Sequence, residues 1–391
     1  MEDIADALGR AADVSVTCLP DGSVDRRYAV EDAAGDVETR RDLGRRIATG
    51  HAKSFLVDHE GTAPGGQAVN AARQLHALGA TTTLYGHLDH AVFDGLPFRT
   101  RSMGRPADVA VFEFDDDAVM FTEESPDVAD WCLDALDAVA DADAETGPFE
   151  ADAVVWTNWA STANGTAALR ALAERERGAE RGDGGDGTAY SGDGGGTGET
   201  SDDTEVDACG GDGAGTLTPR ADGRRWLVLD PGDVTVCERD AVGPFLDALA
   251  ALDGFDVALS VNDDELDFLA DALGGESDAA GTDGEVSDAA RLERVRERGD
   301  LSLAVLHGVD AAVARDAEGT TRCPNLAVDA RRYTGGGDRF SAGLAYALAA
   351  DWTLGEALTL ANACATYYVS HAETAGPDGL AAWLAGRDVD G

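Results

Sequence analysis

The sequence predicts an α/β protein with a mainly parallel central sheet flanked by helices and a small β lid. Short apolar runs alternate with segments of helical periodicity along most of the chain. This alternation is typical of parallel strands joined by crossover helices. Residues 107–124 instead alternate apolar and polar side chains around a turn at 115–117, and they predict a hairpin with one exposed face. The hairpin does not fit the parallel sheet, so it is interpreted as part of a lid.

The N-terminal part begins with a buried strand at 14–19, and an irregular stretch follows it. A helix is expected within 65–80, because Val69, Ala72, Leu75 and Leu78 recur at helical spacing and a glycine then stops it. Further strands and helices are expected in this order: strand 81–86, the hairpin 107–124, strand 151–160, helix 166–177, strand 224–230, strand 255–261 and the helix after it to 273, strands 301–308 and 310–319, and helices 338–350 and 354–371.

Two segments interrupt this order. Residues 178–223 are nearly all Gly, Asp, Ser and Thr. Such a segment cannot bury enough apolar surface to offset its chain entropy, and it predicts a disordered insertion. Residues 274–286 form a shorter acidic insertion. The remainder of 1–391 is expected to fold as a single domain.

The charge of the chain excludes several functions. There are 75 acidic residues against 30 Lys and Arg, a formal net charge of -45, and a single lysine, Lys53. This surface repels nucleic acid and anionic membranes, so neither is expected as a partner. A GK[ST] phosphate loop or a Schiff base requires a lysine, and the sequence around Lys53 fits neither. The composition is typical of a cytosolic protein from a halophilic archaeon, in which salt screens the self-repulsion.

Cysteine usage and hydropathy favour a cytoplasmic location. The six cysteines contain no CxxC pair, so neither a zinc cage nor a redox motif is expected. The first ten residues, MEDIADALGR, are acidic and lack the apolar core of a signal peptide. No apolar run approaches the roughly 20 residues that span a bilayer.

The segment TGGGDRFSAG carries the strongest functional signal. Gly335, Gly336 and Gly337 precede Asp338 at the start of a small-residue helix. Glycines let backbone N–H groups approach a ligand closely, and a helix N-terminus carries a partial positive charge. Together they predict a phosphate site. An aspartate there can accept a proton from a hydroxyl that attacks the phosphate, and the helix terminus is expected to keep it ionised. A plain glycine-rich turn remains the alternative.

Two further motifs have a structural and a functional interpretation. Asn262 and Glu265 lie three apart at a helix start, which fits a capping box, but beside a nucleotide they could also hold Mg²⁺ through its waters. Gly65 and Gly66 precede a helix that carries Asn70 one turn later, which suits either a tight turn or a polyhydroxy ligand.

Acidic and imidazole side chains near the first and second central strands give weaker signals. Asp21 and Asp25 follow the first strand, at an edge where acids face ligands, although in so acidic a chain each can equally be a solvated surface residue. His87 and His90 give weak evidence for a metal.

In their order along the chain, these motifs resemble the ribokinase-like (PfkB) carbohydrate kinase family. GGQAVNAARQLHALGA resembles the first signature of that family, TGGGDRFSAG its second, and VLDPGD and VLHGVDAAVA two intervening segments. The resemblance covers nearly the whole chain outside the two insertions. Three features depart from the family pattern: Arg332-Tyr333 replace the usual Asp-Thr, Asp89 replaces a glycine, and the lid lacks its lysines.

The resemblance implies a ribokinase-like fold and a Mg²⁺-dependent transfer of the γ-phosphoryl of ATP to a sugar hydroxyl. Asp338 would be the catalytic base, and Gly335, Gly336 and Gly337 the anion hole. The implied cofactor-binding residues are Asn262, Glu265, Gly308 and Asn362, with Glu265 meeting the metal through water. The implied substrate ligands are Asp25, Gly65, Gly66 and Asn70. A homodimer formed through the lid is also implied.

Alternatives stay open on the same fold. The acceptor could be a nucleoside, and the donor could be ADP. A sugar- or nucleotide-binding regulator without activity is a rival from another class, and the intact GGGD with its acid argues against it. A dinucleotide-binding dehydrogenase is disfavoured, since no GxGxxG follows the first strand.

The charge predicts salt-dependent stability. The Debye length is about 30 Å at 0.01 M salt and about 3 Å at 1 M, so at low salt the carboxylates repel one another across the molecule. We expect the melting temperature, followed by circular dichroism, to rise as KCl increases from near zero to molar concentration. A melting temperature that stays flat or falls over this series would contradict the halophilic interpretation.

Overall fold

The structure is a computed structural model that describes residues 7–9, 12–32, 35–50, 54–140, 147–182, 225–274, 287–332 and 334–387. The expected insertion 274–286 lies almost wholly outside these residues. Of the expected insertion 178–223, residues 178–182 belong to a helix and the others also lie outside. No helix in the described part of the chain is long and apolar enough to cross a membrane.

The body of the molecule is a nine-stranded sheet. Its strands lie in the order β14 (Thr320–Pro324), β13 (Ala311–Arg315), β12 (Leu303–His307), β11 (Phe255–Val261), β10 (Arg225–Asp230), β9 (Ala153–Thr157), β1 (Ser15–Leu19), β5 (Thr81–Gly86) and β6 (Arg99–Ser102). All neighbours are parallel except at one edge, where β13 is antiparallel to both β12 and β14. The mainly parallel sheet expected from the sequence is confirmed.

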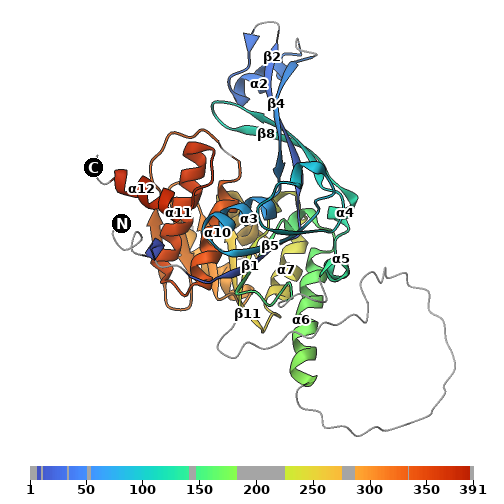
Figure 1. The fold of residues 1–391 in the computed structure, drawn as a ribbon, viewed down its shortest axis with the longest axis vertical. Helices are drawn as coiled ribbons and strands as arrows, with labels where there is room; N and C mark the ends of the chain where they lie inside the picture. The colour runs from blue at the N-terminus through green and yellow to red at the C-terminus, as the bar shows by residue number, and fades with distance from the viewer. Residues whose placement is uncertain are drawn as a thin grey trace, which may run out of the picture.

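Helices cover both faces of the sheet (Figure 1). One face carries α3 (Gln67–Ala77), α10 (Gly336–Ala349), α11 (Leu354–His371) and α12 (Pro377–Arg387), and the other carries α5 (Leu133–Val139), α6 (Gly165–Gly182), α7 (Val242–Leu249), α8 (Asp263–Ala272) and α9 (Asp288–Arg298). Successive strand residues point to opposite faces and so feed two separate cores. In β9, Val155 packs in the first core, while Val154 and Trp156 pack in the second.

A second sheet forms the lid, which projects from the body (Figure 1). Its strands are β2 (Ser23–Asp32), β3 (Gly35–Asp36), β4 (Leu56–Gly65), β7 (Ala107–Glu113) and β8 (Ala118–Glu123), and α2 (Arg40–Ala48) lies between β3 and β4. β2 pairs with β4 along its length and runs parallel to β7. The expected hairpin is β7–β8, so this part of the prediction is confirmed.

Two expectations about local structure are corrected. The stretch after the first strand is not irregular, because it holds β2, α2 and β4. β4 is largely exposed and both strands are rich in polar residues, so hydropathy alone does not reveal them. The helix expected at 166–177 continues as α6 to Gly182, and the Ala-Glu-Arg sequence at 179–181 consists of good helix formers. Residues 178–182 are therefore helical.

The two longest helices of the C-terminal part are in very close contact. A Cβ atom at Gly343 of α10 would lie 2.9 Å from Ala361 Cα of α11 and 3.2 Å from the Cys364 sulfur. Only glycine permits this approach. The contact fixes where α10 lies, and therefore where its N-terminus points.

We expect Gly343→Ala to lower the free energy of unfolding by about 1–3 kcal/mol, because the added methyl group overpacks the contact between α10 and α11. The measurement is chemical denaturation in molar KCl. Gly355→Ala is the matched control: Gly355 lies on α11 with no atom within 4 Å of an added Cβ, so it should be neutral or stabilising by up to about 1 kcal/mol. An equal loss in both variants would contradict this view of the contact.

Candidate active site

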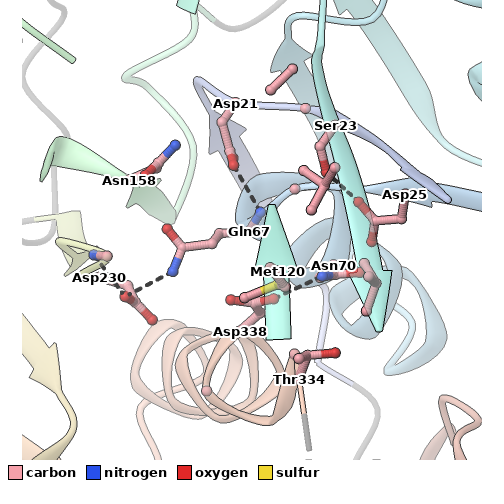
Figure 2. A pocket seen from close by; sticks show the side chains of 18 of the residues that line it. Asp21, Ser23, Asp25, Gln67, Asn70, Met120, Asn158, Asp230, Thr334 and Asp338 are labelled. Carbon is pink, nitrogen blue, oxygen red and sulfur yellow. Dashed lines mark hydrogen bonds between the residues drawn. The ribbon is translucent and has the colours of Figure 1, made fainter. Parts of the chain in front are cut away.

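A cavity of about 1120 Å³ lies at the carboxyl end of the central sheet, beneath the lid. Polar residues from the ends of five strands reach it: Asp21 after β1, Asn158 after β9, Asp230 in β10, Asn262 after β11 and His307 in β12. Carboxyl ends of parallel strands meet at one edge of a sheet, which is where ligands of open α/β folds bind. Figure 2 shows Asp21, Asn158 and Asp230 facing the same space as Asp338.

The N-terminus of α10 opens into this cavity. Gly335 is the N-cap, with a left-handed φ of 84°, and Gly335 and Gly337 line the cavity. A Cβ atom at Gly337 would lie 3.1 Å from the His307 ring. The first N–H groups of a helix have no partner within the helix, so those of Gly336 and Gly337 are available to an anion. Gly336 itself is not among the lining residues.

Asp338 lies in the first turn of α10 and is 6% exposed. Its Oδ2 accepts a hydrogen bond of 2.8 Å from Asn70 Nδ2 and lies 4.0 Å from Arg339 Nη1. The pKa of the Asp338 carboxyl is raised to about 7: burial is the largest cause and the Asp230 charge adds to it, while Arg339 and Asn70 oppose it. The expectation that the helix terminus keeps Asp338 fully ionised is corrected, since burial outweighs the helix dipole.

The residues expected to hold the acceptor lie on one side of Asp338. Asp25, Gly66 and Asn70 line the cavity, and Figure 2 shows Asp25 and Asn70 near Asp338. The Asp25 carboxylate accepts a hydrogen bond of 2.6 Å from Ser23 Oγ and packs directly against the Gly65 backbone, where any side chain would overlap it. Gly66 has a φ of 99° and lies against Gly22. Gly65 therefore makes room for Asp25, outside the cavity lining.

Asp21 caps the N-terminus of α3. It is 5% exposed, so the alternative of a solvated surface residue is wrong. Its carboxylate accepts hydrogen bonds from the backbone N–H of Gln67 (2.9 Å) and of Ala68 (2.7 Å), and from Thr157 Oγ1 (3.0 Å). The N-cap of α3 is Gly66, which has no side chain to cap with, so Asp21 satisfies these N–H groups instead. This fixes the start of α3 and hence Asn70.

Asn262 and Glu265 lie on the opposite side of the cavity and form a complete capping box. Asn262 Oδ1 accepts from the Glu265 N–H (3.0 Å), and Glu265 Oε2 accepts from the Asn262 N–H (2.9 Å). Burial and the nearby Asp230 charge raise the pKa of the Glu265 carboxyl to about 9. The structural interpretation of this motif, a capping box, is confirmed.

Gly308 and Asn362 lie outside the cavity lining. Asn362 Nδ2 donates to the Cys323 carbonyl (3.1 Å), which joins α11 to β14, and a Cβ atom at Gly308 would lie 3.0 Å from Asp263 Oδ1. His87 Nδ1 contacts the Pro20 carbonyl (2.8 Å), while His90 Nδ1 accepts from the Val92 N–H (3.1 Å). Within the described ranges, no three His, Cys, Asp or Glu side chains are arranged to hold a metal ion directly.

The sequence analysis missed a group of cationic and aromatic side chains in the cavity: Arg27, Arg73, Arg332, Arg339 and Tyr368. The sequence contains one feature that could have revealed two of these residues. Arg332 and Arg339 flank the glycine-rich motif that was expected to bind a phosphate. Asp230, which ends a strand, was visible as a strand end but was not assigned a role.

Comparison with known proteins agrees with this geometry. Residues 217–386 match a family model for prokaryotic ketohexokinase. Among solved structures, fructokinase with bound ATP from Xylella fastidiosa aligns with a TM-score of 0.58 at 13% identity, over 96% of this chain and 99% of its own. The Methanocaldococcus jannaschii nucleoside kinase, a ribokinase family member, gives 0.57 at 13% identity over 94% and 98%. No curated protein sequence gives a significant match.

The chain has the ribokinase-like fold, and residues 217–386 are similar to a ketohexokinase family. Aminoimidazole riboside kinase from Salmonella enterica, solved with its riboside and an ATP analogue, also shares this fold, with a TM-score of 0.54 at 18% identity over 95% of this chain and 99% of its own. These identities are low, so the solved structures establish the fold alone. The family model covers the glycine-rich motif and the elements around it, but not β1, β2, α3 or the lid.

The raised pKa of Asp338 predicts how activity depends on pH. Asp338 can accept a proton only when ionised, so the protonated fraction that grows below pH 7 is inactive. We expect kcat/KM to rise with pH and to level off above a midpoint of about 7. The measurement is a pH–rate profile, with circular dichroism at each pH to exclude unfolding. A profile with no inflection near neutrality would contradict this assignment.

Proposed function

We propose that this kinase transfers the γ-phosphoryl of ATP to a hydroxyl of a sugar, with Asp338 as the base. One observation carries the proposal: Asp338 is buried in the first turn of α10, beside the open helix N-terminus, and is hydrogen-bonded to Asn70 from the acceptor side. The base, an anion site and polar groups suited to hydroxyls therefore meet at one point of the cavity.

The residues suggest how the transfer proceeds. Asp25 and Asn70 hold the acceptor so that one hydroxyl points at the Asp338 carboxylate. As the hydroxyl oxygen bonds to the γ-phosphorus, its proton passes to Asp338 and the bond from that phosphorus to the ADP oxygen breaks. The N–H groups of Gly336 and Gly337 stabilise the charge on the transferred phosphoryl group.

Mg²⁺ fits the donor side of the cavity. Glu265 is buried, and the charges of Asp230 and Asp233 raise its pKa, so a divalent cation there relieves the repulsion among these acids. Since the described residues hold no direct metal cage, Glu265 would contact the ion through water, with Asn262 alongside it. The ion would supply charge neutralisation for the triphosphate.

Two classes of compound are candidates for the acceptor. The matching family is that of ketohexokinases, so a ketohexose is the first candidate. A nucleoside is the second, because nucleoside kinases are among the structural neighbours. ATP is the proposed donor, and ADP is the alternative to test beside it.

The lid suggests how copies of the chain associate. Four apolar residues are largely exposed on its edge strands β4 and β8: Leu56, Val57, Met120 and Phe121. We infer that the lid joins two copies of the chain in a homodimer in the cytoplasm.

We expect Asp338→Asn to fold normally and to lose at least about 10²-fold in kcat, within the range of general base catalysis. Asp378→Asn is the matched control, since Asp378 lies in the first turn of α12 and is exposed. The measurement is ADP formation with a panel of sugars and nucleosides in molar KCl. Turnover by Asp338→Asn close to that of the parent would remove Asp338 as the base.

A further inference from the structure

A buried arginine, Arg339, follows directly after Asp338 near the start of α10. It is 2% exposed and is among the largest fully buried side chains in the described part of the chain. Its Nε atom has no hydrogen-bond partner among the described residues. An arginine keeps its charge in proteins, and burial of an incompletely paired charge lowers stability. Core packing therefore does not account for Arg339, because an apolar side chain of similar length would fill the same space.

The Arg339 guanidinium holds the peptide bond at which α10 begins. Its Nη1 donates a hydrogen bond of 3.0 Å to the Gly335 carbonyl. A trans peptide unit is planar, so this carbonyl and the N–H of Gly336 point in opposite directions. With a glycine on each side, the peptide plane could otherwise turn at little cost. The contact with Arg339 therefore fixes the direction of the Gly336 N–H, which is one of the two N–H groups available to an anion.

Tyr368 of α11 holds the guanidinium in place. Arg339 Cζ lies 3.6 Å from the centroid of the Tyr368 ring, which is itself 6% exposed. A Cβ atom at Gly335 would lie 2.8 Å from Arg339 Nη1 and 3.4 Å from Tyr368 Cε1, so the three residues are in close contact. Tyr368 comes two turns after Ala361, whose contact with Gly343 fixes α11 against α10. The packing of the two helices therefore determines where the guanidinium lies.

The same guanidinium lies beside the proposed base. Arg339 Nη1 is 4.0 Å from Asp338 Oδ2. Besides burial, the charges of Asp230 at the end of β10 and of Asp21 after β1 raise the pKa of this carboxyl. The charge of Arg339 and the hydrogen bond from Asn70 of α3 lower it. Arg339 is therefore a cation that offsets two nearby acids, and without it a smaller fraction of Asp338 would be ionised at neutral pH.

We propose that Arg339 is a positioning residue for the phosphoryl transfer, and that it acts through the Gly335–Gly336 peptide and through the Asp338 carboxylate. This inference rests on the proposed kinase function. Both groups matter most during the transfer, because the N–H stabilises charge that develops on the phosphoryl oxygens and the carboxylate accepts the hydroxyl proton. Loss of Arg339 should therefore lower kcat much more than it raises KM for either substrate.

The first test uses Arg339→Met, which fills a similar space without the charge. We expect kcat to fall about 10²-fold, as on loss of one donor to the developing negative charge, with KM for ATP and for the acceptor each within about threefold of the parent. Arg170→Met, on the exposed surface of α6, is the matched control for the loss of one positive charge. An unchanged kcat, with or without a rise in KM, overturns the proposal.

The second test follows the pH–rate profile, which a purely structural role of Arg339 would not move. Removal of its charge raises the pKa of Asp338 above the parent value of about 7, so the ionised form requires a higher pH. We expect the midpoint of kcat/KM to move to higher pH in Arg339→Met. Arg339→Lys keeps the charge but not the planar stack, so its midpoint should stay near that of the parent while kcat remains reduced. An unchanged midpoint in Arg339→Met, or a midpoint at lower pH, overturns the proposal.

A third variant, Tyr368→Leu, removes the stack but keeps the arginine. We expect it to lower kcat, and we expect the double variant with Arg339→Met to lose little more than Arg339→Met alone, because both changes break one unit. Losses that multiply would show that the two side chains act separately, and they would overturn the proposal. Circular dichroism in molar KCl reports folding, and Tyr368→Leu and Arg339→Lys keep the inference testable if Arg339→Met does not fold.

Carbon NMR of the side-chain carboxyl groups separates this inference from the proposed function, because it requires no turnover. The signal of Asp338 is assigned by its absence from Asp338→Asn. We expect its titration midpoint at about 7 in the parent and at a higher pH in Arg339→Met. If no sugar or nucleoside is phosphorylated but this shift is seen, the kinase function fails and the action of Arg339 on Asp338 stands. If the parent phosphorylates sugars but Arg339→Met keeps both kcat and the midpoint, the kinase function stands and the inference is overturned.

Discussion

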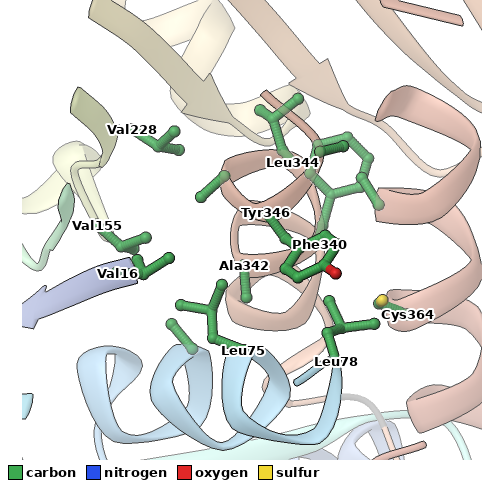
Figure 3. Packing of buried hydrophobic residues seen from close by; sticks show 14 of the residues in the cluster. Val16, Leu75, Leu78, Val155, Val228, Phe340, Ala342, Leu344, Tyr346 and Cys364 are labelled. Carbon is green, nitrogen blue, oxygen red and sulfur yellow. The ribbon is translucent and has the colours of Figure 1, made fainter. Parts of the chain in front are cut away.

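The position of α10 determines where the polar groups at its N-terminus lie in the cavity. The helix packs between the central sheet, α3 and α11, and Figure 3 shows Ala342 of α10 facing Leu75 of α3, with Leu344 on the side of the strands. The absence of a side chain at Gly343 lets α11 come close on the remaining side. Held by three neighbours, the N-terminus of α10 points into the cavity, so packing sets where its first N–H groups and the Asp338 carboxyl lie.

Burial also changes the ionisation of the titratable side chains near this terminus. Asp338 and Glu265 both have raised pKa values, since water is excluded and Asp230 lies nearby. Burial also lowers the pKa of the Arg339 guanidinium. The cavity thus combines buried acids with buried arginines, and burial shifts the pKa of each kind of group toward its neutral form.

The sequence predicted the parallel sheet, the lid hairpin, the start of α10 and the capping box at Asn262, because each depends on local patterns within about a dozen residues. It did not predict β2, α2 and β4, because the many polar residues of the two strands hide their pairing with each other across the lid. It also missed Arg73 and Tyr368, which are nearly 300 positions apart in the sequence and are brought to the same cavity only by the fold. The ionisation of Asp338 was misjudged because burial by distant segments cannot be read from the residues around it.

The path of β2 links the lid to the chemistry. This strand starts at Ser23 beside the cavity, carries Asp25 and Arg27, and then continues outward to Asp32 in the lid, paired with β4 from Ser23 to Glu31. The outer part of the lid and two cavity-lining side chains, Asp25 and Arg27, therefore belong to one continuous strand. A rigid displacement of this strand would move both side chains relative to Asp338, so the orientation of the lid sets the width of the cavity.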